Sequence, residues 1–287
     1  MPIHPLSVVD PQADVHPEAT VGPFCVVKGK VTIAAGAELR NHATVYGRTT
    51  IGAGSILFPG CVVGSDPQDL KYKGEDSEVV IGERVRIHEC VTISKGTTNG
   101  GMKTAIGDDT LVMAYAHVGH DCIIDRQVVI ANNVQMAGHV HVGRKAILSG
   151  LVGIHHFATI GEVTIVGAMS GIRNDLPPFM MCEGTPAEPR SINLIGLRRD
   201  GATEEQIRQI KDAFRVLFHD RANNPTPITE SLAQVAATVP AGDTTSPLAR
   251  LVAWQTRYLA TNVRGRMLEA HRAPIVGGKA TTTTTPA

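Results

Sequence analysis

Aliphatic residues recur at every sixth position along most of the first 172 residues. One run keeps this spacing over residues 3–63, and a second run returns to the same phase over residues 81–93. A third run, shifted by one residue, covers residues 106–172, and no polar residue occupies any of these positions. A helix repeats every ~3.6 residues and an alternating strand every two, so neither element explains the pattern. The chain is therefore predicted to consist of short repeated units.

A second inward position follows each aliphatic by four residues and holds a small or β-branched side chain, for example Cys25, Cys61, Cys122 and Val140. One large and one small inward residue in every six describe a short strand followed by a tight turn. Three such units make one coil of a triangular prism, and successive coils stack about 4.8 Å apart. The pattern predicts that residues 1–190 form an all-β solenoid, a parallel β-helix with an aliphatic interior.

Two segments interrupt the repeat and are predicted to be loops ejected from the solenoid. Residues 65–80 are polar, and residues 97–105 are rich in glycine. Binding residues concentrate on loops that a rigid scaffold holds in place, so we expect substrate contacts on these two segments.

The rest of the chain predicts a C-terminal α-helical domain over residues 191–273. Thr203 opens a capping box at the start of a helix near 203–219. Further helices are expected from Thr229 and over 246–270, and such a bundle would cover the open end of the solenoid.

Composition narrows the class of protein. The net charge is zero, which argues against a nucleic-acid-binding protein held by bulk charge. No apolar run is long enough to span a bilayer, so no stable membrane insertion is expected. The five cysteines lack a metal-binding CxxC spacing and suit reduced thiols in a cytoplasmic protein. The tail 274–287 is low in complexity and is predicted to be disordered.

Histidines gather when the chain is folded at three units per coil. His120, Gly138 and His156 then fall in one column, with Asp121 and His139 in the next. His155 lies in the column on the other side, and His117 lies three residues before His120. Imidazoles clustered beside a carboxylate indicate a functional site rather than scattered surface residues.

Two chemistries fit this cluster, and a non-enzymatic scaffold that only binds its ligands is a third possibility. Neutral imidazoles bind zinc, as in a solenoid enzyme of the carbonic anhydrase kind. Alternatively one imidazole is a general base for acyl transfer. The His120–Asp121 pair favours the base, because the carboxylate can orient the ring, and the Gly138 N–H could face a developing oxyanion.

At this point several motifs resemble a known family. AYAHVGHDC (114–122), ANNVQMAGHV (131–140), NLIGLRRDG (193–201) and PQDLKYKGE (67–75) are similar to segments of the UDP-N-acetylglucosamine acyltransferases, a branch of the hexapeptide-repeat acyltransferases. The resemblance implies a left-handed parallel β-helix with a C-terminal helical domain, a homotrimer, and no cofactor or metal. It also implies transfer of a 3-hydroxyacyl chain from acyl carrier protein to the 3-hydroxyl of UDP-N-acetylglucosamine, the first step of lipid A biosynthesis.

The resemblance also implies roles for single residues. His120 would be the general base, Asp121 would hold it, and the Gly138 amide would stabilise the oxyanion. The residues implied in substrate binding are His117, His139, His155, His156, Gln68, Asp69, Lys71, Asn193 and Arg199. Of these, Asp69 and Lys71 would reach the substrate from a neighbouring subunit, and Asn193 and Arg199 would bind the uridine diphosphate.

Four positions depart from the family pattern or set its specificity. Asp200 stands where a second basic residue is common, and Ser94 replaces a histidine. His156 stands where glutamine is common, so a UDP 2,3-diamino sugar stays open as the acceptor. Ala168, followed by Met169, occupies the position that limits the acyl groove and predicts an intermediate-to-long donor chain.

Overall fold

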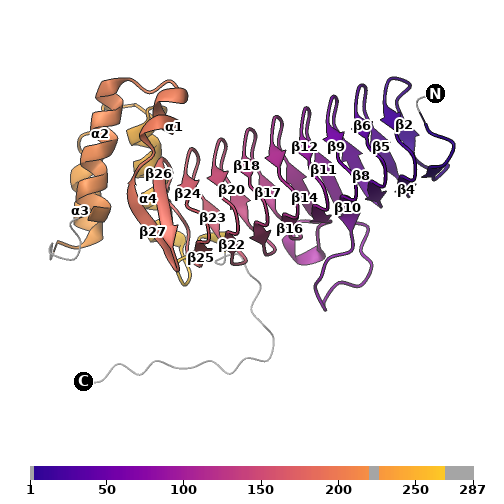
Figure 1. The fold of residues 1–287 in the computed structure, drawn as a ribbon. Helices are drawn as coiled ribbons and strands as arrows, with labels where there is room; N and C mark the ends of the chain where they lie inside the picture. The colour runs from indigo at the N-terminus through magenta and orange to yellow at the C-terminus, as the bar shows by residue number, and fades with distance from the viewer. Residues whose placement is uncertain (1–2, 220–225, 269–287) are drawn as a thin grey trace, which may run out of the picture.

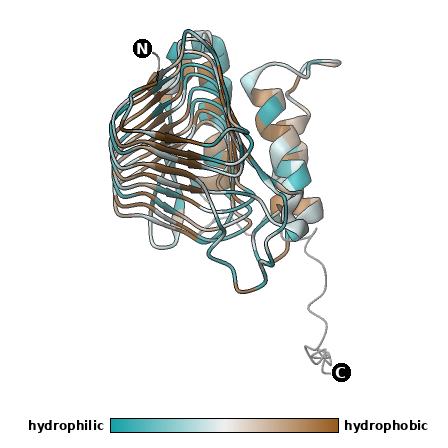
Figure 2. Cartoon of the chain, turned by 90° about the vertical axis from the view of Figure 1, so that its right-hand side faces the viewer, coloured by the Kyte–Doolittle hydropathy of each residue, from teal (hydrophilic) through white to brown (hydrophobic). Residues whose placement is uncertain are grey.

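The computed structural model describes residues 3–219 and 226–268. Its solenoid is a stack of triangular coils, and the helices lie at the end of the stack opposite the N-terminus (Figure 1). Seen along the stack, successive coils lie nearly on top of one another (Figure 2).

Three sheets form the sides of the prism. The first sheet contains β1 (Val8–Val9), β4 (Val26–Lys28), β7 (Thr44–Tyr46), β10 (Val62–Ser65), β13 (Thr92–Ser94), β16 (His117–Val118), β19 (Gln135–Met136), β22 (Gly153–Ile154) and β25 (Gly171–Ile172). The second contains β2 (Asp14–Val15), β5 (Val31–Ile33), β8 (Arg48–Ile51), β11 (Glu78–Ile81), β14 (Lys103–Ile106), β17 (Ile123–Ile124), β20 (His141–Val142) and β23 (Thr159–Ile160). The third contains β3 (Thr20–Val21), β6 (Glu38–Leu39), β9 (Ile56–Leu57), β12 (Arg86–Ile87), β15 (Leu111–Val112), β18 (Val129–Ile130), β21 (Ile147–Leu148), β24 (Ile165–Val166), β26 (Met180–Gly184) and β27 (Ala187–Ile192).

The sixth-position aliphatics fill the interior, as predicted. Val118 pairs in parallel with Met136, and Met136 pairs with Ile154, so the large side chains stack coil on coil. They are essentially buried from Val21 to Ile172. Only the aliphatics of the first coil, such as Ile3 and Val9, are half-buried, because no further coil covers that end.

The two loops explain how the phase of the repeat changes. Ile51 pairs with Ile81, 30 residues later, and Ile81 pairs with Ile106, 25 residues later, against 18 for an ordinary coil. The first excess is a multiple of six and keeps the phase, whereas the second shifts it by one residue. Because residues 78–80 and 103–105 pair with each other in the second sheet, the ejected loops are shorter than predicted and cover 66–77 and 95–102.

Each coil turns at three corners, and two of them matter below. The histidine corner joins the first sheet to the second and consists of the turn residues His120–Asp121, Gly138–His139 and His156–Phe157. The plain corner joins the third sheet to the first and consists of Ala114–Tyr115, Asn132–Asn133, Gly150–Leu151 and Ala168–Met169. The second residue of each turn has left-handed backbone, for example φ 59° at Asp121 and 62° at Leu151.

The helical region covers the last coils. Its elements are α1 (Leu194–Arg199), α2 (Glu204–Phe214) continued by a π turn, η2 (Arg215–His219), α3 (Ile228–Ala236) and α4 (Pro247–Thr261). A separate 3-10 turn, η1 (Thr98–Gly100), lies in the second ejected loop. The hairpin β26–β27 is antiparallel and extends the third sheet towards them. Leu197, Ile207 and Ile210 are buried in the same apolar core as the solenoid interior.

The sequence patterns predicted α2 and α3 well, but they predicted α4 too long and did not predict α1. The Thr203 capping box is present, with Gln206 completing it. The helix expected over 246–270 ends at Thr261, because Asn262 takes extended backbone, and Arg264 and Gly265 then turn the chain in left-handed backbone. The six-residue helix α1 was not predicted, and the tail 274–287 lies outside the described residues. In the part of the chain that the structure describes, no helix combines the length and the apolar character needed to cross a bilayer.

Candidate active site

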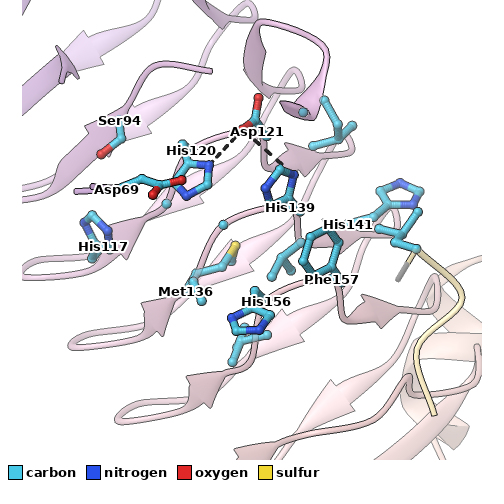
Figure 3. A pocket seen from close by; sticks show the side chains of 18 of the residues that line it. Asp69, Ser94, His117, His120, Asp121, Met136, His139, His141, His156 and Phe157 are labelled. Carbon is cyan, nitrogen blue, oxygen red and sulfur yellow. Dashed lines mark hydrogen bonds and ion pairs between the residues drawn. The ribbon is translucent and has the colours of Figure 1, made fainter. Parts of the chain in front are cut away.

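A groove of about 1520 Å³ runs along the histidine corner (Figure 3). Its floor comes from consecutive coils, and its rim comes from the two ejected loops and from α4. The lining residues predicted from sequence are Gln68, Asp69, Lys71, His117, His120, Asp121, Gly138, His139 and His156. The groove therefore gathers most of the predicted site within one chain.

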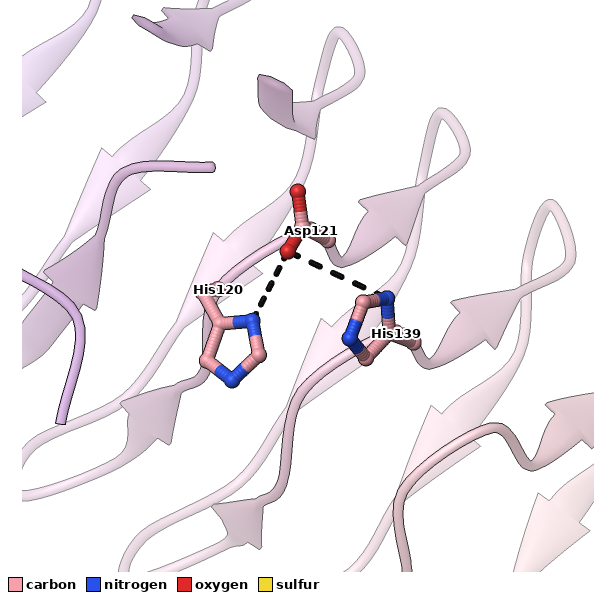
Figure 4. A group of neighbouring side chains, drawn as sticks. All are labelled: His120, Asp121 and His139. Atoms are coloured by element: carbon pink, nitrogen blue, oxygen red, sulfur yellow. Dashed lines mark hydrogen bonds and ion pairs between the residues drawn. The ribbon is translucent and has the colours of Figure 1, made fainter. Parts of the chain in front are cut away.

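His120 and Asp121 form the centre of this site (Figure 4). His120 Nδ1 lies 2.8 Å from Asp121 Oδ2, and the Asp121 carboxylate is almost completely buried. A carboxylate can only accept, so Nδ1 carries the proton and donates it, and in the neutral form of the ring Nε2 is then the unprotonated nitrogen. That tautomer is the one a general base requires.

The second feature of the centre is the glycine one coil above. A Cβ added to Gly138 would lie 2.5 Å from His120 Cε1 and 2.6 Å from Nε2, so the ring occupies the space of a side chain. The Gly138 N–H donates to no backbone or side-chain acceptor among the described residues. Glycine is thus required here by the imidazole, and its amide is free to bind an incoming oxygen.

Two other histidines flank the pair. His139 Nδ1 lies 3.8 Å from Asp121 Oδ2, and the His139 ring stacks on Phe157 with centroids 4.4 Å apart. His117 Nδ1 pairs with Thr92 Oγ1 at 2.7 Å. Burial lowers the pKa of both His117 and His139, although the Asp121 charge partly opposes this at His139. Both rings are therefore held in their neutral form as hydrogen-bonding groups.

Three residues of the first ejected loop lie beside the histidines. Gln68, Asp69 and Lys71 line the groove of their own chain, and the contact of Asp69 and Lys71 with a neighbouring subunit's substrate stays a prediction. Asp69 points towards His120 in Figure 3. The loop folds back over its own coils because Lys95 pairs with Asp66 at 2.9 Å and Thr98 Oγ1 donates to Glu75.

His155 and His156 separate. His156 lines the groove, whereas His155 does not; its ring lies 3.9 Å from that of His156, and its Nδ1 pairs with the His156 carbonyl oxygen. Column stacking placed both residues correctly in height but could not tell which ring turns towards the groove.

The remaining predicted residues lie elsewhere on the chain. Asn193 is buried: its Nδ2 donates to the Val163 carbonyl and its Oδ1 caps α1 by accepting from Gly196 N. Arg199 is exposed on α1, and Ala168 and Met169 are exposed on the plain corner. Within one chain, none of these four reaches the groove.

Asp200, the departure from the family pattern, has a structural role. It accepts from Arg144 at 2.7 Å and from Lys145 at 2.7 Å, and Arg250 lies 3.7 Å away. Burial alone would favour the neutral acid, but these hydrogen bonds hold the pKa of Asp200 well below its usual range. The charge ties the end of α1 to the solenoid and to α4.

Sequence reasoning missed several residues around the groove. Thr97 donates twice to Asp121, and Thr104 Oγ1 accepts from the Asp121 amide. Arg257 of α4 and His141 of the second sheet also line the groove. Position in the 18-residue coil could have flagged His141, but the path of an ejected loop has no period, so no sequence signal pointed to Thr97.

The same centre contains the donors that a metal would use. One atom each from His120, Asp121 and His139 lies within 4.8 Å of the others. Two imidazoles and a carboxylate suit zinc. Both Asp121 oxygens, however, already accept from Thr97 or His120, so this carboxylate is satisfied by hydrogen bonds alone.

Comparisons with known proteins point in one direction. A family profile described as "Udp N-acetylglucosamine O-acyltransferase; Domain 2" matches residues 175–259, and one described as "Bacterial transferase hexapeptide (six repeats)" matches residues 103–138. The acyl-[acyl-carrier-protein]--UDP-N-acetylglucosamine O-acyltransferase of Verminephrobacter eiseniae is 40% identical over 92% of this chain and 98% of its own length. The enzyme of the same name from Synechocystis is 47% identical over 67% of each chain.

Solved structures agree. LpxA from Acinetobacter baumannii superimposes with a TM-score of 0.83 at 32% identity, covering 93% of this chain and 99% of its own. The UDP-N-acetylglucosamine acyltransferase of Francisella novicida gives a TM-score of 0.82 at 33% identity, covering 92% and 93%. These neighbours have the left-handed β-helix, which confirms the handedness expected for this solenoid.

Proposed function

This chain belongs to the UDP-N-acetylglucosamine O-acyltransferase family, and we infer that it transfers an acyl chain from acyl carrier protein to UDP-N-acetylglucosamine in lipid A biosynthesis. The observation that carries this is the alignment with the Verminephrobacter enzyme, which extends over both the solenoid and the helical region. We further propose that the donor is a 3-hydroxyacyl thioester and that the acceptor oxygen is the sugar 3-hydroxyl.

In the proposed step, His120 Nε2 takes the proton of the sugar hydroxyl as the oxygen attacks the thioester carbonyl. Asp121 keeps Nδ1 protonated and stabilises the imidazolium that forms. The tetrahedral intermediate then collapses, the C–S bond breaks, and the proton passes from His120 to the departing thiolate. The products are the sugar ester and the free thiol of acyl carrier protein.

The Gly138 amide is the proposed oxyanion donor. It lies beside the His120 ring, so the attacking oxygen and the developing O⁻ would both be within reach of fixed groups. A preorganised N–H needs no reorganisation as charge develops, and one such donor typically contributes about 10²- to 10³-fold in rate.

A second copy of the chain would complete the site. Arg199, Ala168 and Met169 are exposed outside the groove of their own chain, so they could meet the substrate in a partner's groove, whereas the buried side chain of Asn193 could not. This placement supports the proposed homotrimer, in which the uridine diphosphate contacts and the limit of the acyl groove come from a neighbour. A cytoplasmic location stays a prediction from sequence.

Specificity is proposed from two positions. Ala168 predicts an intermediate-to-long donor chain, and a ladder of acyl carrier protein thioesters analysed by mass spectrometry tests it; preference for the shortest donor would contradict it. His156 lines the groove where the acceptor would bind, so UDP-N-acetylglucosamine and the UDP 2,3-diamino sugar should be assayed in parallel.

The base is tested with His120→Ala. Activity should fall by about 10²- to 10⁴-fold or more, because the base and its orientation are both lost. His88→Ala is the matched control, because His88 Nδ1 likewise pairs with the carboxylate of the following residue, Glu89 (3.3 Å), but His88 lies outside the groove. Near-normal turnover of His120→Ala would refute the assignment.

Metal analysis separates the zinc alternative. Protein purified without chelator should retain its activity after extensive treatment with a zinc chelator. Stoichiometric zinc whose removal abolishes turnover would instead assign His120, Asp121 and His139 as ligands.

A further inference from the structure

We propose that Thr97, in the loop of residues 95–102, is a positioning residue that fixes the Asp121 carboxylate and through it the His120 ring. The proposal rests on the base role given to His120 above. It extends the His120–Asp121 pair to a third residue that comes from an ejected loop and not from the repeat.

Thr97 makes two hydrogen bonds to the same carboxylate. Its backbone N–H donates to Asp121 Oδ1 at 2.8 Å, and its hydroxyl donates to Oδ2 at 2.6 Å. Both residues are buried, with exposed fractions of 4% for Thr97 and 5% for Asp121. A buried carboxylate requires such donors, and two of them from one residue fix the rotation of the carboxylate as well as its position.

That rotation decides which imidazole is oriented. Oδ2 lies 2.8 Å from His120 Nδ1 but also 3.8 Å from His139 Nδ1, so two rings face one oxygen. Because the Thr97 N–H holds Oδ1 and the Thr97 hydroxyl holds Oδ2, Oδ2 stays directed towards His120. Without the hydroxyl bond, the carboxylate could turn towards His139 and leave His120 without its partner.

The loop backbone is built around the carboxylate. A Cβ on Gly100 would lie 1.9 Å from Asp121 Cγ, so only glycine allows the loop to approach this closely. The Thr97 carbonyl accepts from the amides of Gly100 and Met102, which closes the turn through backbone bonds alone. The shape of the loop therefore does not depend on the Thr97 hydroxyl, which is left with Asp121 as its partner.

The loop of residues 95–102 also contacts the first ejected loop, residues 66–77, and the strand that follows it. Thr98 Oγ1 donates to Glu75 Oε1 at 2.9 Å, and the Glu78 amide donates to the Met102 carbonyl. Gln68, Asp69 and Lys71 of that first loop line the groove. Residues 95–102 thus contact the carboxylate on one side and the loop that lines the groove on the other.

The test compares Thr97→Val, which keeps the shape but removes the hydroxyl donor, with Thr97→Ser, which keeps the donor. Steady-state kinetics would use the full chain with a 3-hydroxyacyl-acyl carrier protein and UDP-N-acetylglucosamine. We expect kcat of Thr97→Val to fall about 10- to 100-fold, the loss typical of a hydrogen bond to a charged group, with both KM values within about threefold. Thr97→Ser should keep kcat within about threefold.

Thr110→Val is the matched control. Thr110 is a buried threonine of the solenoid that bonds a backbone carbonyl (Asp125 O, 3.3 Å) away from the groove. Circular dichroism and gel filtration establish that each variant folds, and Thr97→Ala replaces Thr97→Val if the valine does not.

Three results would overturn the proposal: kcat of Thr97→Val within threefold of wild type, Thr97→Ser as impaired as Thr97→Val, or an effect confined to KM. The His120→Ala variant separates this from the wider assignment. If His120→Ala stays active, His120 is not the base and the proposed function is refuted. If His120→Ala is inactive but Thr97→Val has a normal kcat, only the positioning role of Thr97 is refuted.

Discussion

The histidine corner and the plain corner share one backbone and differ in everything else. Each turn places its second residue in left-handed backbone, at Asp121 and His139 on one side and at Tyr115 and Leu151 on the other. On the plain corner these residues are 60% and 59% exposed. On the histidine corner they are packed against loops and against one another, and Asp121 is 5% exposed.

The difference shows what a repeat can and cannot do. Repetition places side chains at equivalent positions in successive coils, evenly spaced along the stack, and it does so at every corner. Chemistry arises only where the delivered residues can polarise one another and where added structure excludes water. Here both conditions hold at the histidine corner, because the two ejected loops leave the solenoid beside it.

The largest effect should come from the same substitution at the two corners. Gly138 and Gly150 both occupy the first turn position, but a Cβ on Gly138 would strike the His120 ring at 2.5 Å, whereas one on Gly150 would meet only Asn132 O at 3.5 Å. Gly138→Ala should lower kcat about 10²- to 10³-fold by displacing the base and its oxyanion donor. Gly150→Ala should stay within about twofold of wild type.

Alanine is already tolerated at the plain corner, at Ala114 and Ala168, which makes Gly150→Ala a fair control. Equal losses of activity in the two variants would mean that the turn itself, and not the histidine, requires glycine.

A smaller effect is expected on stability. Phe157 and Leu151 both have left-handed backbone (φ 65° and 62°), but only Phe157 stacks on a ring, that of His139 at 4.4 Å. Phe157→Ala should lower the free energy of unfolding by about 1–2 kcal/mol, since an aromatic pair contributes beyond its buried area. Leu151→Ala should change it by less than about 0.5 kcal/mol.

Denaturant unfolding followed by circular dichroism measures both variants. If Leu151→Ala proved the more destabilising of the two, the plain corner would be covered in solution and the contrast in exposure would not hold.

The smallest expected effect is a change in how steeply the free energy of unfolding depends on pH. Burial lowers the pKa of His139 below its ordinary 6.5, so the folded state resists protonation of this ring. Its contribution to stability is fully present above the unfolded pKa and is lost as the pH falls. Replacing it with glutamine should therefore flatten the fall in stability between about pH 7 and pH 5 relative to wild type.

Asn133→Gln, at the equivalent turn position of the plain corner, carries no titrating group and should leave the slope as it is. Thermal unfolding at four or five pH values provides the comparison. An unchanged slope for His139→Gln would show that the ring is not desolvated in the folded protein. His117, whose pKa is also lowered, accounts for part of the remaining slope in every variant.

Much of the site followed from the sequence because the solenoid converts sequence distance into height. Stacking every 18th residue placed Gly138 over His120 and His139 over Asp121, and the structure has both contacts. Stacking failed where the chain leaves the repeat. It could not orient His155, it gave no position for the loop residue Asp69, and it gave no reason to connect Thr97 with Asp121.

The sequence by itself determined the parallel solenoid and the column in which each histidine lies, because inward positions at every sixth residue admit no other register. Only the tertiary structure decided how the two ejected loops close over the histidine corner. Loop closure over the His120–Asp121 pair depends on contacts between residues far apart in sequence, such as Thr97 with Asp121 and Thr98 with Glu75. An ejected loop obeys no period, so its return to the carboxylate is set by hydrogen bonding and close packing in three dimensions.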